Sequence, residues 1–218
     1  MAEPIAVVAG ATGLVGRELV LQLAADGCWG EVRALVRGAL PPELAVPRVI
    51  AAPVDYEQLH PSASWVSGDH VFCALGTTMR RAGSPAAFRR VDFTYPLTLA
   101  RAARAHDARH FLLVSALGAD ATSRLFYNHV KGELESAIIA LGFRAVTIAR
   151  PSLLLGPRAE RRIGEELGKA LGFLAPPRWR PVLASQVARG LIASARRDEP
   201  GVHILENREL RAMPNATA

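Results

Sequence analysis

A glycine-rich loop near the amino terminus restricts the fold of this chain more than any other feature. Residues 5–9 are uniformly apolar, which predicts a buried strand, and residues 13–25 have the apolar spacing of a helix. Between them stand Gly10, Ala11, Thr12, Gly13, Leu14, Val15 and Gly16. In dinucleotide-binding folds the first glycine makes the turn, the second admits a pyrophosphate, and the third lets helix and strand pack closely. These seven residues are therefore predicted to hold a dinucleotide at a helix N-terminus.

The remainder of the first 150 residues alternates between apolar runs and helical patterns. Strands are expected at residues 31–36, 49–54, 70–75, 110–115 and 145–149, and helices at 93–106 and 127–141. Strands that are apolar throughout and alternate with helices predict a parallel sheet covered on both faces. A closed barrel of eight such units takes about 250 residues, and this chain has 218. The expected fold class is therefore α/β, a Rossmann-type doubly wound parallel sheet.

The pattern changes after Arg150, where prolines interrupt the chain repeatedly. Helices are expected at residues 160–171 and 185–195, and a short strand at 202–205. These elements are too few for an independent domain. We therefore expect a dinucleotide-binding core over residues 1–150, and a small C-terminal cap over residues 151–218 on the substrate side.

The charge and hydrophobicity of the chain indicate whether a nucleic acid or a membrane is an expected partner. The chain has 26 basic and 20 acidic residues, a formal net charge of +6, which suits an anionic partner such as nucleic acid or a solvated arginine-rich surface. We favour the second, and so expect no nucleic-acid partner. Neither an apolar stretch of about 18 residues nor a secretory signal occurs, so no membrane association is expected.

The cysteines and histidines carry no metal-binding pattern. Cys28 and Cys73 lack CxxC spacing, which favours free thiols in a reduced, cytoplasmic protein. His106 and His110 have HxxxH spacing, but His110 begins an expected strand, so the two rings would not share a helical face. No metal site is therefore expected.

Arg37 follows the second expected strand, where dinucleotide folds meet the adenosine ribose. An acidic residue there selects NAD(H), whereas an arginine accommodates the 2′-phosphate of NADP(H). The segment 35–37 has no acid, and Arg33 is near in sequence, so NADP(H) is favoured over NAD(H). Further cofactor contacts are expected from Asp55, after the third strand, and from Leu75, Gly76 and Thr77, after the fourth.

A tyrosine and a lysine four residues apart suggest acid–base chemistry. Tyr127 and Lys131 lie on one face of an expected helix. A nearby ammonium would favour the phenolate and lower the pKa of the tyrosine. Ser115 ends the fifth strand, at the sheet edge where ligands bind, and its hydroxyl would hydrogen-bond a substrate carbonyl. Lysine is scarce, since the chain contains only Lys131 and Lys169, which makes the pairing more specific.

Further segments extend this pattern and carry a resemblance. They are residues 72–78, 91–92, 115–120 and 205–207, and residues 150–157, which match RPxxxxGP. With them the chain resembles the extended or atypical short-chain dehydrogenases/reductases, and among these the Tat-interacting, oxidoreductase-like group and its bacterial relatives. The resemblance covers essentially the whole chain. Two features depart from it: Ala116 stands where extended members usually have a second serine, and the C-terminal part is shorter than in sugar-nucleotide epimerases.

The resemblance implies roles for named residues. NADP(H) would bind residues 10–16, and Ser115, Tyr127 and Lys131 would form a catalytic triad. Lys131 would also hold the nicotinamide ribose, beside Tyr127, and Pro151 would belong to the segment that closes over the nicotinamide.

Three functions follow as hypotheses. The first is an NADP(H)-dependent oxidoreductase that transfers hydride between nicotinamide and a small carbonyl or alcohol substrate, with Tyr127 as proton donor or acceptor. The second is a non-catalytic NADP(H)-binding regulator with a protein partner. The third is an epimerase or dehydratase that retains its cofactor. A homodimer through the helices at 93–106 and 127–141 is also expected.

Overall fold

A seven-stranded, wholly parallel sheet forms the centre of the protein in a computed structural model, which describes residues 3–59, 64–156 and 177–214. Along the sheet the strands follow the order β3 (Val49–Pro53), β2 (Glu31–Val36), β1 (Ile5–Ala9), β4 (His70–Cys73), β5 (His110–Val114), β6 (Ala145–Arg150) and β9 (Gly201–Glu206). The Rossmann-type α/β fold expected from the sequence is confirmed.

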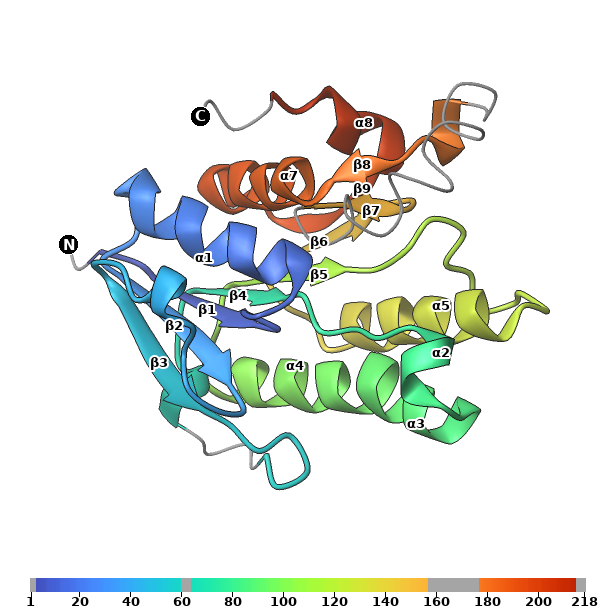
Figure 1. Cartoon of the computed structure of the whole chain (residues 1–218), viewed down its shortest axis with the longest axis horizontal. Coiled ribbons are helices and arrows are strands. Elements are labelled where there is room, and N and C mark those ends of the chain that lie inside the picture. The colour runs from blue at the N-terminus through green and yellow to red at the C-terminus, as the bar shows by residue number, and fades with distance from the viewer. Residues whose placement is uncertain (1–2, 60–63, 157–176, 215–218) are drawn as a thin grey trace.

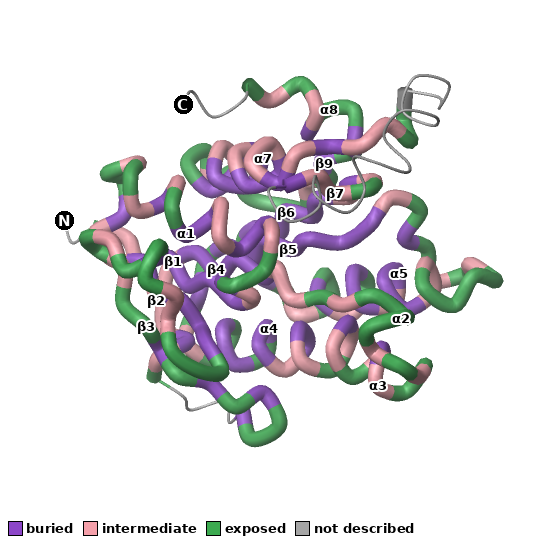
Figure 2. Tube along the Cα trace, in the orientation of Figure 1, coloured by how far each residue is buried: buried purple, intermediate pink, exposed green. Residues whose placement is uncertain are grey.

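Helices cover both faces of the sheet (Figure 1). On one face lie α1 (Leu14–Asp26) and α7 (Ala184–Arg197), and on the other lie α4 (Tyr95–Ala105) and α5 (Phe126–Ile139). The central strands therefore have apolar partners on both faces, which explains why their residues are apolar throughout, whereas the edge strands β3 and β9 are largely exposed. Figure 2 shows the result, since the central strands are buried along most of their length.

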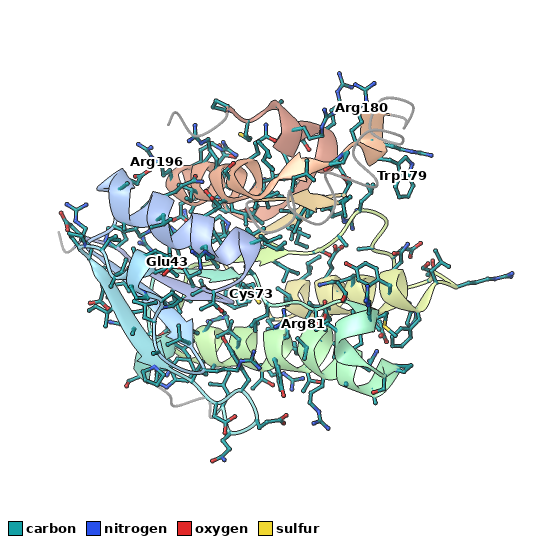
Figure 3. All side chains as sticks on the ribbon, in the orientation of Figure 1. Glu43, Cys73, Arg81, Trp179, Arg180 and Arg196 are labelled. Carbon is teal, nitrogen blue, oxygen red and sulfur yellow. The ribbon has the colours of Figure 1, made fainter. Side chains whose placement is uncertain are left out.

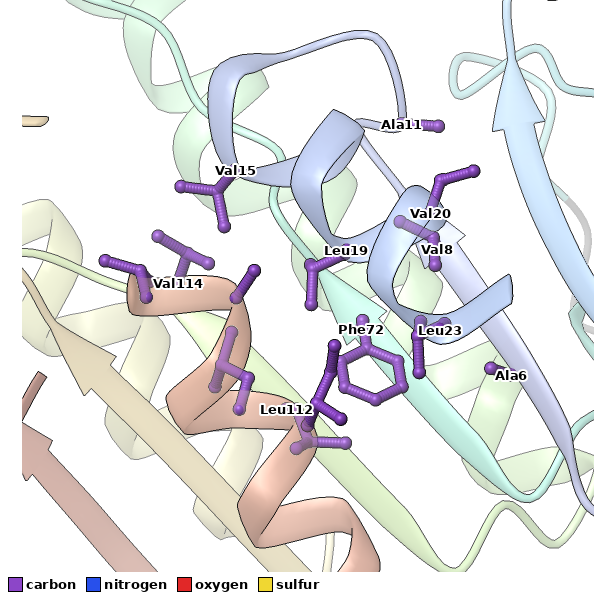
Figure 4. Packing of buried hydrophobic residues seen from close by; sticks show 14 of the residues in the cluster. Ala6, Val8, Ala11, Val15, Leu19, Val20, Leu23, Phe72, Leu112 and Val114 are labelled. Carbon is purple, nitrogen blue, oxygen red and sulfur yellow. The ribbon is translucent and has the colours of Figure 1, made fainter. Parts of the chain in front are cut away.

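The packing of α1 on the sheet shows how this core is built. Leu19 and Leu23, one turn apart on the helix, are fully buried together with Phe72 of β4 and Leu112 of β5 (Figure 4). Truncation of a fully buried leucine to alanine typically costs about 2–5 kcal/mol. This packing holds the N-terminus of α1 in place over the carboxyl edge of the sheet.

The C-terminal part contributes to the sheet itself. Strand β9 pairs with β6 in parallel register, with Ala145 opposite Gly201, and α7 packs beside α1. The division expected at residue 150 therefore cuts through the layers of the core. The sequence underestimated this region because a short strand after many prolines gives no sign of its neighbour in the sheet. The helix expected at residues 160–171 lies outside the described residues.

Smaller elements of the same region lie beside the sheet. The short strands β7 (Leu154–Leu155) and β8 (Val182–Leu183) pair with each other, and α8 (Asn207–Ala212) follows β9. Asn207 ties them together, because its side chain accepts from Ser152 N–H and donates to the carbonyls of Arg178 and Arg180.

The segment between β4 and α4 is more helical than expected. It forms α2 (Met79–Ala82), α3 (Pro85–Arg89) and a π-helical turn, η3 (Arg90–Thr94), which runs into α4. Thr78 and Ser84 cap the two short helices by accepting hydrogen bonds from backbone N–H groups. These caps and Pro85 are local helix signals that apolar spacing does not register. Over the described ranges, no helix has the length and apolar character needed to cross a bilayer.

Candidate functional site

The glycine loop meets the end of β4 so closely that side chains are excluded. Gly10 has φ of +77°, and a Cβ atom there would lie 2.5 Å from the carbonyl oxygen of Ala74. At Gly16 a Cβ atom would lie 2.0 Å from the carbonyl oxygen of Gly10, which lets α1 start directly on the loop. Gly13 donates its N–H to that same oxygen at 2.9 Å. The loop therefore opens at the switch point between β1 and β4, where such sheets bind ligands.

A cavity of about 500 Å³ lies at this point, within the range of small-molecule sites. Many of the residues expected to contact a cofactor line it, namely Gly10, Thr12, Gly13, Arg37, Leu75, Gly76 and Thr77. The two strand ends that meet at this cavity are those of β1 and β4.

Other residues expected at the cofactor do not line the cavity. Ala11, Val15 and Gly16 are buried beneath the loop, and Leu14 packs next to Gly156. Their contribution to the site is to shape the turn and seat the helix. Asp55 is exposed, and its carboxylate accepts the N–H of Glu57 at 2.9 Å. Pro151 is buried, and its carbonyl accepts the N–H of Leu117.

The cavity has a wall that sequence reasoning missed. Tyr56 lines it, directly after Asp55, and stacks on Tyr95 with ring centroids 5.6 Å apart. The hydroxyl of Tyr56 is buried near the backbone of Gly10, and burial raises its pKa. The signal was its position: Tyr56 stands three residues after the end of β3 and faces the cavity, while Asp55 itself forms a turn.

Arginines supply the charge of the cavity. Arg17, Arg37 and Arg81 line it, and no carboxylate does so among the described residues. Figure 3 labels Arg81, which belongs to α2, and Cys73, which ends β4. Arg17 is paired with Glu43 at 2.5 Å, whereas Arg37 is exposed. Arg33, near Arg37 in sequence, instead binds Glu31 and the carbonyl of Ser67.

Helix α5 carries the expected acid–base residues Tyr127 and Lys131, which are outside the described cavity lining. Tyr127 is 37% exposed, and its ring packs against Phe88 of α3 with centroids 5.4 Å apart. One turn on, the Nζ atom of Lys131 lies 2.7 Å from Oδ1 of Asp92, in the π-helical turn. The other oxygen of Asp92 accepts the N–H of Thr77 at 2.8 Å. The lysine is therefore connected through one carboxylate to the cavity lining.

The pKa of Tyr127 differs from the sequence expectation. Burial raises it, Lys131 lowers it, and Asp92 raises it again, with a net shift upward. The pKa of Lys131 is also raised, because Asp92 and Tyr127 outweigh the effect of its burial. The expectation of a lowered tyrosine pKa was wrong because burial of the Tyr127 hydroxyl raises its pKa by more than Lys131 lowers it, and Asp92 adds to the rise.

The hydrogen-bond partner of Ser115 is a residue other than Tyr127. Its hydroxyl donates to Oε1 of Glu135 at 2.5 Å, and Glu135 pairs with Arg150 at 2.6 Å. Glu135 lies eight residues after Tyr127, a distance of about 12 Å along the helix axis. Tyr127 and Lys131 are thus brought together, while the Ser115 proton is already used by a buried carboxylate.

Two histidines and an aspartate meet at the opposite edge of the sheet. His70 begins β4, His110 begins β5, and ligand atoms of both lie with Asp198 within 4.8 Å of one another. However, Trp29 donates its indole N–H to Nδ1 of His70, which leaves the proton of a neutral ring on Nε2, the atom that faces Asp198. A protonated nitrogen is not a metal ligand, so the arrangement fits a buried polar cluster better than a metal site.

Comparison with known proteins agrees with this geometry. Residues 10–155 match the family model described as NAD(P)H-binding.

The chain belongs to this NAD(P)H-binding family.

Relatives of this NAD(P)H-binding protein cover most of its length. Protein HTATIP2 of Rattus norvegicus is 37% identical over 172 residues, 78% of this chain and 71% of the relative. The mitochondrial protein FMP52 of Eremothecium gossypii is 32% identical over 217 residues, 95% and 96% of the two chains. The resemblance to atypical short-chain dehydrogenases/reductases is thereby confirmed.

Solved structures share the fold at low sequence identity. A short-chain dehydrogenase/reductase family oxidoreductase from Burkholderia thailandensis superposes with a TM-score of 0.74 at 20% identity, covering 96% of this chain and 94% of that one. MoeE5 in complex with UDP-glucose and NAD gives 0.72 at 19% identity, covering 92% and 74%.

Proposed function

We propose that this NAD(P)H-binding protein is an NADP(H)-dependent oxidoreductase of the short-chain dehydrogenase/reductase type, acting on a small carbonyl or alcohol substrate. The observation that carries the proposal is the arrangement on α5. Tyr127 and Lys131 share one face of the helix, and Asp92 joins Lys131 to the Thr77 N–H in the cavity wall. A proton donor and a nucleotide cavity are thus parts of one connected structure.

The cavity fits a dinucleotide in chemistry as well as in volume. Its floor is backbone that a Cβ atom at Gly10 would obstruct, and Gly13 begins a helix whose first N–H groups suit a pyrophosphate. The nicotinamide supplies or accepts the hydride when it is bound. The residues of the chain bind the nucleotide, shield the reacting carbon, and exchange a proton at the Tyr127 hydroxyl.

Selection of NADP(H) over NAD(H) rests on Arg37 and Arg81. Both line the cavity, and the described lining has no carboxylate to accept the ribose 2′-hydroxyl. Guanidinium groups bind a 2′-phosphate through charge-assisted hydrogen bonds. Isothermal titration with NADPH and NADH tests this, and tighter binding of NADH would refute it.

An assay of cofactor absorbance tests the reaction. The purified protein is incubated with NADPH and a panel of aldehydes, ketones and quinones, and oxidation at 340 nm is followed against the Tyr127→Phe variant. Turnover that requires Tyr127 supports the oxidoreductase. Product formation without net NADPH oxidation would instead support an epimerase or dehydratase.

A second candidate has one specific observation in its favour. Ser115 gives its proton to Glu135, and Ala116 follows it, so no serine hydroxyl at the end of β5 is free to hold a carbonyl. A protein that binds NADP(H) and signals its occupancy to a protein partner needs no such group. Binding of NADPH without turnover of any carbonyl, together with capture of a partner that depends on NADPH, would favour this candidate.

We further propose that the protein is cytoplasmic and that it forms a dimer through α4 and α5. The FMP52 relatives are named mitochondrial proteins, which makes the compartment a separate question for cell fractionation. Analytical ultracentrifugation tests the dimer.

A further inference from the structure

Asp92 and Lys131 form an ion pair that is almost completely removed from water. The side chain of Lys131 is 4% exposed, that of Asp92 is 1% exposed, and the charged atoms are 2.7 Å apart. Burying both charges is costly, and a pair of this kind persists only where further contacts hold its geometry. The N–H of Thr77 provides such a contact to the second carboxylate oxygen.

The local backbone packs closely against this ion pair. Asp92 lies in the π-helical turn between α3 and α4, a widened turn of a type often found at functional sites. Gly76 lies against the pair from the cavity side, where a Cβ atom would be 3.3 Å from Oδ1 of Asp92 and 3.8 Å from Nζ of Lys131. The pair therefore sits directly behind the cavity wall.

Titratable groups from three elements surround Lys131. The titratable groups that face it are Asp92 from the π-helical turn, Tyr127 from its own helix, and Cys73 from β4. Burial raises the pKa of the Cys73 thiol to about 12, so this group stays neutral near pH 7. Lys131 and Asp92 also face Tyr127. The ammonium is thus balanced by a carboxylate before Tyr127 is considered.

We propose that Asp92 is a positioning residue that neutralises Lys131, so that Tyr127 is held as a phenol and the site works at neutral pH as a carbonyl reductase. This inference rests on the proposed function. It differs from a site in which an unbalanced lysine makes the tyrosine a base for alcohol oxidation. With a proton-donating phenol near neutral pH, the direction that this arrangement favours is reduction of the carbonyl substrate named in the proposed function.

The reaction balances with the groups present. A hydride from the reduced nicotinamide forms a C–H bond at the carbonyl carbon, while the C=O π bond breaks and its electron pair moves to oxygen. Tyr127 gives its proton to that oxygen, and solvent restores the proton to the phenolate. NADPH is oxidised to NADP⁺, and the carbonyl is reduced to the alcohol.

Lysine NMR tests the pair without an activity assay. Protein labelled with ¹³C,¹⁵N-lysine contains only Lys131 and Lys169, so the Lys169→Arg variant leaves a single signal. In the otherwise unaltered protein the Lys131 signal should remain that of an ammonium beyond about pH 10.4, the ordinary lysine pKa. In Asp92→Asn the Tyr127–Lys131 pair should lose its first proton at least about one pH unit lower.

Matched variants distinguish the effect of losing Asp92 on the Lys131 titration from the effect of losing any carboxylate. Glu133→Gln removes a carboxylate of α5 that pairs with Arg89, and it should leave the Lys131 titration unchanged. Asp92→Glu keeps the charge and should restore the wild-type titration. A Lys131 signal that titrates alike in the wild type and in Asp92→Asn overturns the proposal. If Asp92→Asn does not fold, a wild-type Lys131 that titrates below about pH 10.4 overturns it.

The pH profile of turnover adds the functional readout. The alkaline limb of carbonyl reduction, where the Tyr127 phenol loses its proton, should move in Asp92→Asn to lower pH by about one unit, while Asp92→Glu follows the wild type. An unmoved limb contradicts the inference. Absence of all turnover, with the NMR shift present, would defeat the proposed function and leave the role of Asp92 toward Lys131 intact.

Discussion

Ser115 donates its hydroxyl proton to Glu135, which is buried and paired with Arg150. A hydroxyl has one proton, so in this arrangement Ser115 is not a donor toward a substrate carbonyl. The residue that looks catalytic in sequence belongs to a polar network that joins β5, α5 and β6.

Ser115→Ala should therefore change stability more than turnover. The loss of a hydrogen bond to a buried charged group costs about 1.5–3 kcal/mol. We expect the urea midpoint to fall while kcat changes less than about threefold, a factor worth well under 1 kcal/mol. A loss of a hundredfold or more in kcat, with stability unchanged, would show that Ser115 takes part in the reaction.

Tyr127→Phe should abolish turnover and leave cofactor affinity nearly unchanged. The substitution removes the exchangeable proton but keeps the ring that packs on Phe88. Tyr95→Phe is the control for turnover only, because Tyr95 lines the cavity and its hydroxyl binds Glu57. Kd for NADPH and single-turnover rates measure the two effects. Undiminished turnover in Tyr127→Phe would contradict the proposed function.

Arg37→Ala and Arg81→Ala should each weaken NADPH binding by about 10–100-fold, the equivalent of one charge-assisted hydrogen bond. The affinity for NADH should change little, because NADH lacks the 2′-phosphate. Arg80→Ala is the control, since Arg80 is the neighbour of Arg81 on α2 and is exposed outside the cavity lining. Equal losses for NADPH and NADH would show that these arginines do not read the 2′-phosphate.

Acid should destabilise the protein through the histidine cluster. Burial and the neighbouring His70 lower the pKa of His110 to about 4, and burial also lowers that of His70. Between about pH 6.5 and pH 4 the unfolded chain binds a proton at His110 that the folded chain does not, so stability falls as pH falls, by up to about 3 kcal/mol.

Urea unfolding at pH 7, 6, 5 and 4.5 measures this slope. His110→Gln should flatten it, while His129→Gln, at a partly exposed histidine of α5, should not. A slope that is identical in all three proteins would show that His110 is not the group responsible.

The fold was predictable because its signals are local. The glycine loop needs only Gly10, Gly13 and Gly16 between a strand and a helix, and apolar runs mark each buried strand. Strand β9 was seen as a strand but not as a member of the sheet, since its pairing with β6 joins residues 56 apart. No short-range pattern reports such a partner.

The site was predictable in its residue types but not in its charges. Spacing placed Tyr127 and Lys131 together correctly. Asp92 precedes Lys131 by 39 residues, and only the packing of the π-helical turn on α5 brings their charges into contact. The same holds for Glu135, whose bond to Ser115 depends on how α5 lies against the end of β5.

Strand β5 has a consequence for anyone who measures this protein against pH. It begins at His110 and ends one residue before Ser115, so the acid-sensitive cluster and the cavity edge are separated by about 17 Å of rigid strand. Loss of stability at the amino-terminal edge would contribute to any decline of activity below pH 6. The alkaline side of the same curve would report the reacting groups, so a single bell-shaped profile would combine two unrelated processes.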